Sequence, residues 1–219
     1  MDEAFTGQEI PDNWPGSLWL EGRTIVHLKD GQERPTHMPR GPATKTGTGF
    51  MNPAMAPART RSVLLLQDAL EHGWLGENRP IRALDALCAT GIRVRRWRNE
   101  IKHELQNRLH ITANDLDARA LDWAIASTNS DNDVLAIDPI DDEQIQPNFI
   151  ERNGIKFQNS DARLAMVQGS FQWIDVDPFG SPIAFLDNAL QALGRVGVLE
   201  VTATDTAALT ASERRASPG

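Results

Sequence analysis

The sequence has one cysteine, no long apolar run and fewer basic than acidic residues, and each shortage excludes a class of protein. Cys88 alone cannot form an internal disulfide or a cysteine-rich zinc cluster, so we expect a reducing, cytoplasmic setting and no metal. No apolar run reaches the roughly 18 residues that span a membrane. The first 15 residues carry four acidic side chains, which is the wrong charge for a secretory signal.

The charge balance also argues against a protein that coats nucleic acid. The chain has 22 Lys and Arg against 30 Asp and Glu, a net charge of -8. Proteins that coat nucleic acid usually present a basic surface. The balance is still compatible with an enzyme that has one local basic patch.

Short apolar strands and amphipathic helices alternate along most of the chain. This alternation predicts an α/β fold with a mostly parallel sheet and helices on both faces. Right-handed crossovers then bring the carboxyl ends of the strands to one edge, where ligands of such sheets bind. The expected strands are 81–87, 109–113, 155–157, 171–176 and 196–203, and the expected helices are 58–75, 92–105, 117–128, 161–167 and 182–193.

Two segments lie outside this alternation. Residues 17–28 read as one or two strands with a turn near Glu21-Gly22, and residues 29–49, rich in Gly, Pro, Thr and Lys, read as a mobile loop. We therefore expect a small N-terminal β extension over 1–56, followed by the main domain over 57–219. Residues 130–153 carry seven acidic side chains and favour a solvated surface insertion.

The first strand ends in a turn of small residues that opens a helix, Cys88-Ala89-Thr90-Gly91-Ile92-Arg93. Small residues let a ligand approach the backbone, and a helix start offers free N–H groups. The turn has one glycine where a dinucleotide site has three, and it lacks the Gly-Lys-Ser/Thr of a P-loop. A nucleoside-type ligand without a pyrophosphate and an ordinary strand-to-helix turn both fit.

The second and third strand ends carry acidic residues with two readings each. Asp115 is placed to accept hydrogen bonds from ribose hydroxyls, whereas Asp117 fits the cap of the following helix. At the third end, Asp161 could accept a bond from an adenine amino group while Ala162 offers its backbone N–H. Asp161 could equally be a helix cap.

The fourth strand end is the most informative, because an acid, a proline and an aromatic ring follow one another as Asp177-Pro178-Phe179. Strand periodicity puts Asp175 and Asp177 on one face. An arylamine is a poor nucleophile, because its lone pair is delocalised into the base. A carboxylate and a backbone carbonyl that accept its two N–H groups localise that pair, and an aromatic ring holds the base by stacking. The motif therefore indicates amine chemistry on a nucleobase.

Arginines are concentrated in the helix that follows the first strand. Arg93, at the helix start, faces the expected ligand edge. Arg95, Arg96 and Arg98 fit either a solvated face or a patch that binds phosphates.

These residues resemble the tRNA (guanine-26, N2)-dimethyltransferases over about residues 21–209. The resemblance is strongest in the Asp-Pro-Phe-Gly-Ser-Pro and Thr-Ala-Thr-Asp runs. The matching segments are Phe50 to Pro53 with Arg59, Leu84 to Leu87, Thr90 to Arg93, Asn114-Asp115, Asp161-Ala162, Asp175 to Pro182, Phe185 to Asp187 and Val201 to Asp205.

The resemblance implies a class I methyltransferase fold, S-adenosylmethionine as cofactor and tRNA as the partner, methylated on N2 of guanine 26. It also implies a separate C-terminal tRNA-binding domain, so with the chain ending at Gly219 we expect an incomplete methyltransferase domain. By resemblance the catalytic residues are Asp177, Pro178 and Phe179, and the cofactor-binding residues are Arg59, Arg93, Asp115, Asp161 and Ala162.

Two alternatives remain at this point. One is a non-catalytic remnant that binds S-adenosylmethionine or RNA without turning it over. The other is an amine methyltransferase that acts on another nucleic acid.

Overall fold

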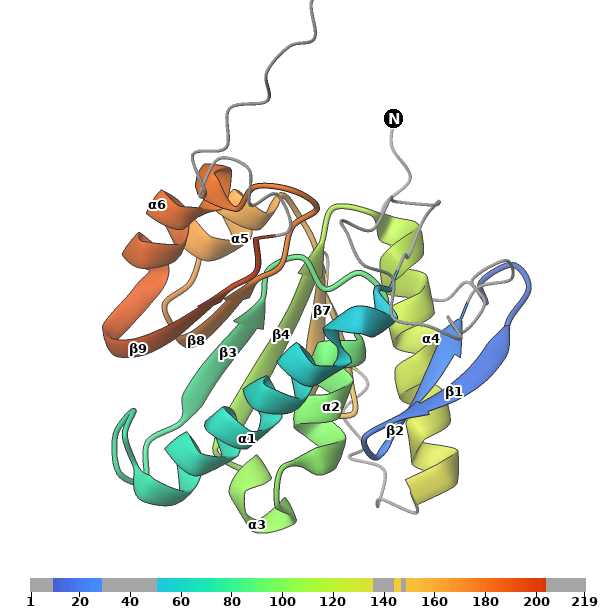
Figure 1. Cartoon of the computed structure of the whole chain (residues 1–219), viewed down its shortest axis with the longest axis horizontal. Helices are drawn as coiled ribbons and strands as arrows, with labels where there is room; N and C mark the ends of the chain where they lie inside the picture. The colour runs from blue at the N-terminus through green and yellow to red at the C-terminus, as the bar shows by residue number, and fades with distance from the viewer. Residues whose placement is uncertain (1–9, 29–50, 136–143, 147–148, 204–219) are drawn as a thin grey trace, which may run out of the picture.

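A computed structural model of the chain describes residues 10–28, 51–135, 144–146 and 149–203 (Figure 1). Its main sheet has seven strands in the order β5-β6-β7-β4-β3-β8-β9, of which β7, β4, β3, β8 and β9 are parallel. These five are the strands that the sequence predicts, with shifted ends. Their bounds are β3 (Ile81–Asp85), β4 (Leu109–Asp115), β7 (Ile155–Asn159), β8 (Phe171–Val176) and β9 (Leu193–Val201).

The order of the parallel strands fixes where a ligand can bind. The first parallel strand, β3, lies in the middle of the sheet. The next two, β4 and β7, follow on one side of it, and the last two, β8 and β9, lie on its other side. The connections that follow β3 and β8 therefore diverge to opposite sides. This divergence opens a crevice at the carboxyl ends of β3 and β8.

Helices cover both faces of the sheet, and two apolar cores result. The larger core lies under α1 (Ala56–His72), α2 (Ile92–Glu100) and α4 (Ala118–Leu135), which Figure 1 shows in front of the sheet. The smaller core lies under α5 (Ala162–Val167) and α6 (Ile183–Ala192). Two short helices, η1 (Pro53–Met55) and α3 (His103–Gln106), complete the helices of the described residues.

The predicted N-terminal strands form a hairpin of β1 (Ser17–Glu21) and β2 (Thr24–Leu28). The hairpin packs on α2 and α4 rather than on the sheet (Figure 1). The backbone oxygen of Ile25 accepts a bond of 2.6 Å from Arg95, and the His27 ring lies 2.9 Å from the Ser130 hydroxyl. The expected loop over 29–49 lies outside the described residues.

Three helix predictions are wrong in detail. The helix expected over 92–105 breaks at Ile101, whose extended backbone separates α2 from α3. The apolar spacing of the helix expected over 58–75 predicts Trp74 on its buried face, but Trp74 lies beyond the end of α1 and is half-exposed. The spacing of the helix expected over 182–193 predicts Ile183 and Leu190 on its buried face, but both are exposed, and the buried side chains of α6 are the small Ala189 and Ala192.

The expected solvated insertion over 130–153 is also wrong where the structure describes it. α4 continues to Leu135, and Asp131 is buried against Arg95. β5 (Gln144–Gln146) and β6 (Phe149–Arg152) extend the sheet as antiparallel edge strands, and Ile150 is buried in the larger core. Among the described residues, no helix has both the length and the apolar character to cross a bilayer.

Candidate functional site

The turn after β3 has the tight geometry expected of a ligand loop. Gly91 caps α2 at φ +72°, and a Cβ on it would lie 2.9 Å from the Cβ of Ala124 on α4. Ala89 also has a positive φ of +48°, which non-glycine residues rarely adopt. Its N–H donates to Asp115 at 2.8 Å, so the bond across to β4 helps hold the strained turn.

Asp115 and Asn114 at the end of β4 tie three strand ends together. The two Asp115 oxygens accept backbone N–H groups, one from Ala89 and one from Asp117 at 2.9 Å. The buried Asn114 amide donates to the backbone oxygens of Ala86 and Ser160, each at 3.0 Å. Whether Asp115 also binds a ribose stays a prediction.

Asp161 caps α5, as one of its two readings expects. Its carboxylate accepts the Arg163 N–H at 2.8 Å and pairs with the Arg163 side chain at 2.7 Å. Hydrogen bonds from Arg163 hold the pKa of Asp161 down at about 2. Ala162 follows as the first residue of α5 and is buried. Neither residue lines the pocket described below, and their cofactor role stays a prediction.

Arg93 connects the two acidic residues of the fourth strand end. Its Nε lies 2.9 Å from Asp175 and its Nη2 lies 3.0 Å from Asp177. Asp175 is buried, whereas a quarter of the Asp177 side chain is exposed. Strand periodicity thus correctly predicted that both carboxylates lie on one side of the strand. Arg93, in the first turn of α2, is their common partner.

Two further carboxyl groups belong to the same layer of the sheet. Asp85 and Glu200 flank Asp175 in register on the neighbouring strands. Burial raises the pKa of Asp85 to about 7 against the opposing charge of Arg93, and burial likewise raises the pKa of Asp175. Burial alone lowers the pKa of Arg93, but the surrounding carboxylates outweigh it and raise that pKa. Asp85 lies in the Leu84 to Leu87 segment of the family resemblance, but the sequence assigned it no role.

The turn after β8 presents an aromatic ring to solvent. Pro178 is buried, Phe179 is 53% exposed, and Gly180 at φ +89° turns the chain toward α6. A phenyl ring left half in water beside a carboxylate is available to stack on a planar ligand.

A pocket opens at the crevice between β3 and β8. Of the predicted site residues it brings together Arg59, Arg93, Asp177, Pro178 and Phe179. Asp115 borders it through its bond to Ala89. Its other lining residues are Met51, Asn52, Met55, Asp85, Leu87, Cys88, Ala89, Thr90, Ile92 and Asp175. All of these except Met55 lie in the ligand turn or in the segments that carry the family resemblance.

Arg59 reaches this pocket as the partner of a residue from the N-terminal hairpin. Its Nε and Nη2 each donate at 2.7 Å to the two oxygens of Glu21, and both side chains are about 95% buried. Nη2 also contacts the Asn52 backbone oxygen at 3.1 Å and the Met51 sulfur at 3.4 Å. Its predicted contact with a cofactor remains untested.

Both readings of the remaining α2 arginines are wrong, because Arg95, Arg96 and Arg98 are buried. Arg95 pairs with Asp131 at 2.6 Å, and Arg96 pairs with Glu100 at 2.7 Å and with Glu21 at 3.1 Å. Arg98 donates to Gln106, and burial lowers its pKa. These arginines hold the hairpin and helices together instead of facing water or phosphate.

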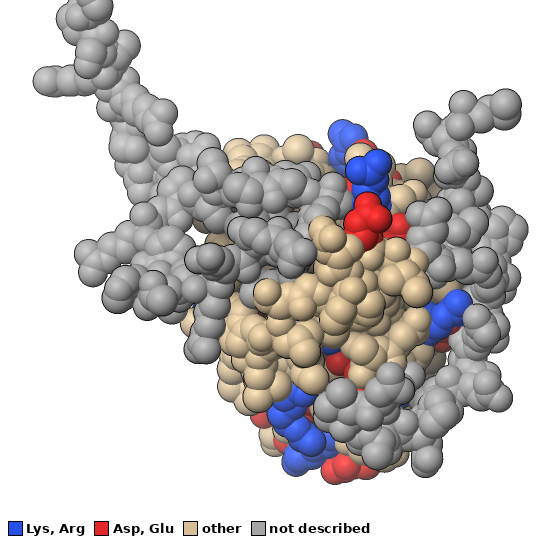
Figure 2. Space-filling model, turned by 90° about the vertical axis from the view of Figure 1, so that its right-hand side faces the viewer, with Lys and Arg blue, Asp and Glu red and all other residues tan. Residues whose placement is uncertain are grey.

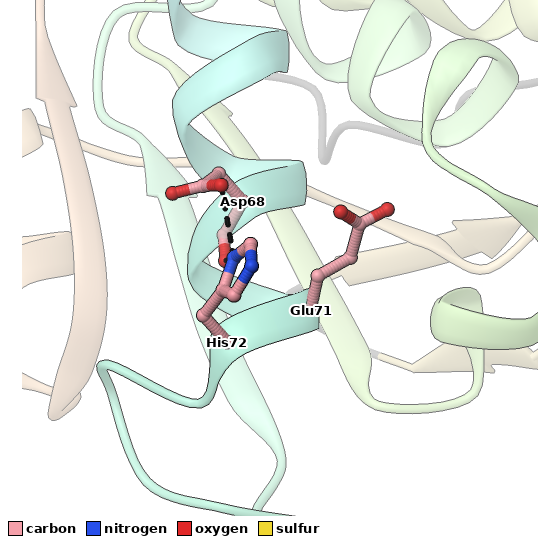
Figure 3. A group of neighbouring side chains, drawn as sticks. All are labelled: Asp68, Glu71 and His72. Atoms are coloured by element: carbon pink, nitrogen blue, oxygen red, sulfur yellow. Dashed lines mark hydrogen bonds and ion pairs between the residues drawn. The ribbon is translucent and has the colours of Figure 1, made fainter.

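A group of possible metal ligands, Asp68, Glu71 and His72, lies near the end of α1 (Figure 3). His72 is 2.9 Å from Asp68 in an exposed helical pair, and Glu71 is 2.6 Å from Lys102. Pairs of this kind are common on helix surfaces. Since each side chain already has a partner, the group carries no argument for a metal site.

The strand order, the single-glycine turn and the pocket at the switch point together define a Rossmann-like class I methyltransferase fold. A solved structure, Trm5b from Pyrococcus abyssi, matches at a TM-score of 0.50 and 12% identity. The match covers 86% of this chain and 40% of that one, and it supports the fold alone.

The family model of N2,N2-dimethylguanosine tRNA methyltransferases matches residues 29–217. The chain belongs to this family. It is 34% identical over 196 residues to a tRNA (guanine(26)-N(2))-dimethyltransferase of Thermococcus kodakarensis, covering 88% of this chain and 46% of that protein. It is 36% identical over 171 residues to that of Pyrococcus furiosus, covering 76% and 40%.

A human relative carries a different position in its name. It is a tRNA (guanine(27)-N(2))-dimethyltransferase, 30% identical over 137 residues, which cover 61% of this chain and 18% of that protein. The chain thus spans less than half the length of each of these relatives.

Proposed function

We propose that the protein transfers methyl groups from S-adenosylmethionine to the exocyclic N2 of a guanine in tRNA, at position 26. The observation that carries the proposal is the turn Asp177-Pro178-Phe179, which lines the pocket at the switch point of the sheet. Family membership supports the substrate, since the archaeal relatives are named for guanine 26.

The pocket has the donors and acceptors that the cofactor needs. Two guanidinium groups, Arg59 and Arg93, suit its carboxylate, and Leu87 and Ile92 supply apolar wall. Asp115 stands next to the pocket, where it could accept bonds from ribose hydroxyls. When bound, S-adenosylmethionine supplies an already activated methyl group, so positioning accounts for much of the acceleration.

Asp177 is the group that acts on the amine. Arg93 holds its Oδ2 at 3.0 Å, and no described residue donates a hydrogen bond to Oδ1. Oδ1 would accept one N–H of the guanine amine and take its proton as N2 bonds to the methyl group, whose bond to the cofactor's sulfonium sulfur breaks with the electron pair left on sulfur. A backbone carbonyl of the turn, that of Pro178, accepts the second N–H. Phe179 stacks on the base and keeps the amine in line.

The first prediction concerns this carboxylate. Asp177→Asn should lower methyl transfer to unmodified tRNA at least ~100-fold, because the variant keeps the shape but cannot take the proton. Incorporation of tritiated methyl groups measures transfer, and calorimetry should find cofactor affinity within a few-fold of wild type. Glu104→Gln, which changes an exposed carboxyl group on α3, is the matched control and should leave both unchanged.

Two results would contradict the proposal. Transfer at the wild-type rate by Asp177→Asn would remove Asp177 from the mechanism. Cofactor binding by the wild type without any transfer would favour a binding remnant instead.

Position 27 is a second candidate, because the human relative is named for it. Mass spectrometry of nuclease digests locates the methylated nucleotide. Methylation at 27, or in another nucleic acid only, would overturn the choice of guanine 26.

A further inference from the structure

The N-terminal hairpin reaches the ligand pocket through one side chain. Glu21, the last residue of β1, pairs with Arg59 through both oxygens at 2.7 Å. Arg59 in turn lines the pocket and donates to the Asn52 backbone oxygen, which belongs to the same wall. Glu21 itself does not line the pocket, and neither does its second partner Arg96, so Arg59 is its direct connection to a ligand.

The geometry of this pair makes Arg59 depend on Glu21. Two parallel N–H···O bonds fix the guanidinium plane as well as its position. The pair is about 95% buried, so a guanidinium without its carboxylate would be left uncompensated in a poor environment for charge. Without Glu21, we expect Arg59 to turn toward water or toward Asp85 and Asp175, the two buried acids that line the same pocket.

We propose that Glu21 is a positioning residue of the ligand pocket, which holds Arg59 and the 51–52 segment in the arrangement that binds the cofactor. The hairpin is then a working part of the site. This inference rests on the proposed function, because it takes the ligand to be S-adenosylmethionine.

The structure contains a comparable pair that lacks the connection to the pocket. Arg95 and Asp131 are joined by two bonds of 2.7 and 2.6 Å and are also almost fully buried. Arg95 donates to the Ile25 backbone oxygen, so this pair anchors the same hairpin, here to α2 and α4 instead of α1. Neither residue lines the pocket. Asp131→Asn therefore controls for loss of a buried ion pair and for loosening of the hairpin.

The test compares Glu21→Gln with Asp131→Asn in the whole 219-residue chain. Thermal unfolding first measures the stability that each variant loses. Calorimetric titration with S-adenosylmethionine then measures affinity. We expect Glu21→Gln to bind at least tenfold more weakly than wild type and Asp131→Asn to bind within threefold of it. In tRNA assays, Glu21→Gln should raise the KM for the cofactor and leave kcat within threefold.

A conservative pair keeps the test decisive if Glu21→Gln does not fold. Glu21→Asp retains the charge but withdraws it by one methylene, and Asp131→Glu is its counterpart. Glu21→Asp should weaken cofactor binding three- to tenfold, and Asp131→Glu should not. In a folded series, Glu21→Asp should lie between wild type and Glu21→Gln.

The outcomes distinguish a failure of the positioning role of Glu21 from a failure of the proposed function. Equal affinity of wild type and the Glu21 variants overturns the positioning role, and so does an equal loss in the Asp131 variants. If the wild type itself does not bind S-adenosylmethionine, the proposed function fails and the role of Glu21 toward that cofactor fails with it.

Discussion

At the scale of single residues, the site contains more acidic side chains than its one nearby arginine can neutralise. Among the described residues, Asp85, Asp175, Asp177 and Glu200 surround Arg93, and each acts on it electrostatically. One guanidinium cannot neutralise four carboxylates. Burial therefore keeps the deepest of them, Asp85 and Asp175, in their protonated forms to higher pH. Asp177 is more exposed than these two on the pocket side, and it is the member to which the proposed function assigns the substrate proton.

This arrangement predicts a pH-dependent stability. The pKa of Asp85 is about 7 in the folded protein and 3.8 in the reference state. The folded state thus keeps a proton that the unfolded chain releases, and stability falls as pH rises between these two values. The free energy of unfolding of wild type should fall relative to Asp85→Asn by about 2–4 kcal/mol across this window. Urea unfolding at several pH values measures it, and parallel curves would contradict the prediction.

At the scale of elements, α2 is the helix on which the site is assembled. Gly91, in the ligand turn, caps the start of α2, and Arg93 follows in the first helical turn. The later arginines Arg95 and Arg96 bind α4 and the hairpin. The helix can sit this close to α4 only because Gly91 has no side chain, since a Cβ there would lie 2.9 Å from Ala124. Packing between two helices thus sets the shape of the ligand turn.

Gly91→Ala tests this packing. The added methyl group meets both the strain of φ +72° and the contact with Ala124, so we expect a loss of about 2–4 kcal/mol in the free energy of unfolding. Gly154→Ala is the control, because Gly154 has a similar φ of +68° but only an ordinary contact of 3.5 Å, to Arg98. It should lose about 1–2 kcal/mol. Urea unfolding gives both values, and equal losses would show that strain alone matters.

At the scale of the whole molecule, the arginines clustered in α2 add no positive charge to the surface. All four arginines of α2 are buried. Figure 2 shows a face on which isolated basic and acidic groups are separated by uncharged surface, with no continuous basic patch among the described residues. RNA that approaches this face therefore meets few of the described cations.

The consequence is a shallow salt dependence of RNA binding. Each neutralised phosphate contributes about 0.7–0.9 to the slope of log affinity against log salt. We expect the chain to make few phosphate contacts, so the slope for tRNA should stay below about 3. Fluorescence anisotropy with labelled tRNA over a range of salt concentrations measures it. A slope of 6 or more would contradict the expectation of few phosphate contacts.

The sequence by itself determined the features that depend on neighbours along the chain. Strand periodicity located the parallel strands, and turn chemistry located their ends, including the Asp177-Pro178-Phe179 turn. The sequence also placed Arg93 at the ligand edge and predicted the capping role of Asp161, because the start of a helix depends on residues that are neighbours in the chain. Resemblance added Arg59, which no local pattern would have singled out.

Only the tertiary structure decided which charges meet. Glu21, Arg59 and Arg96 come from three separate elements, and their ion pairs exist because packing brings them together away from water. The same packing buries the arginines of α2, which we expected on a charged surface. Helical periodicity cannot predict this burial, since the spacing of arginines in a helix is the same whether they face solvent or buried carboxylates. The partner across the interface decides, and that partner is set by the fold.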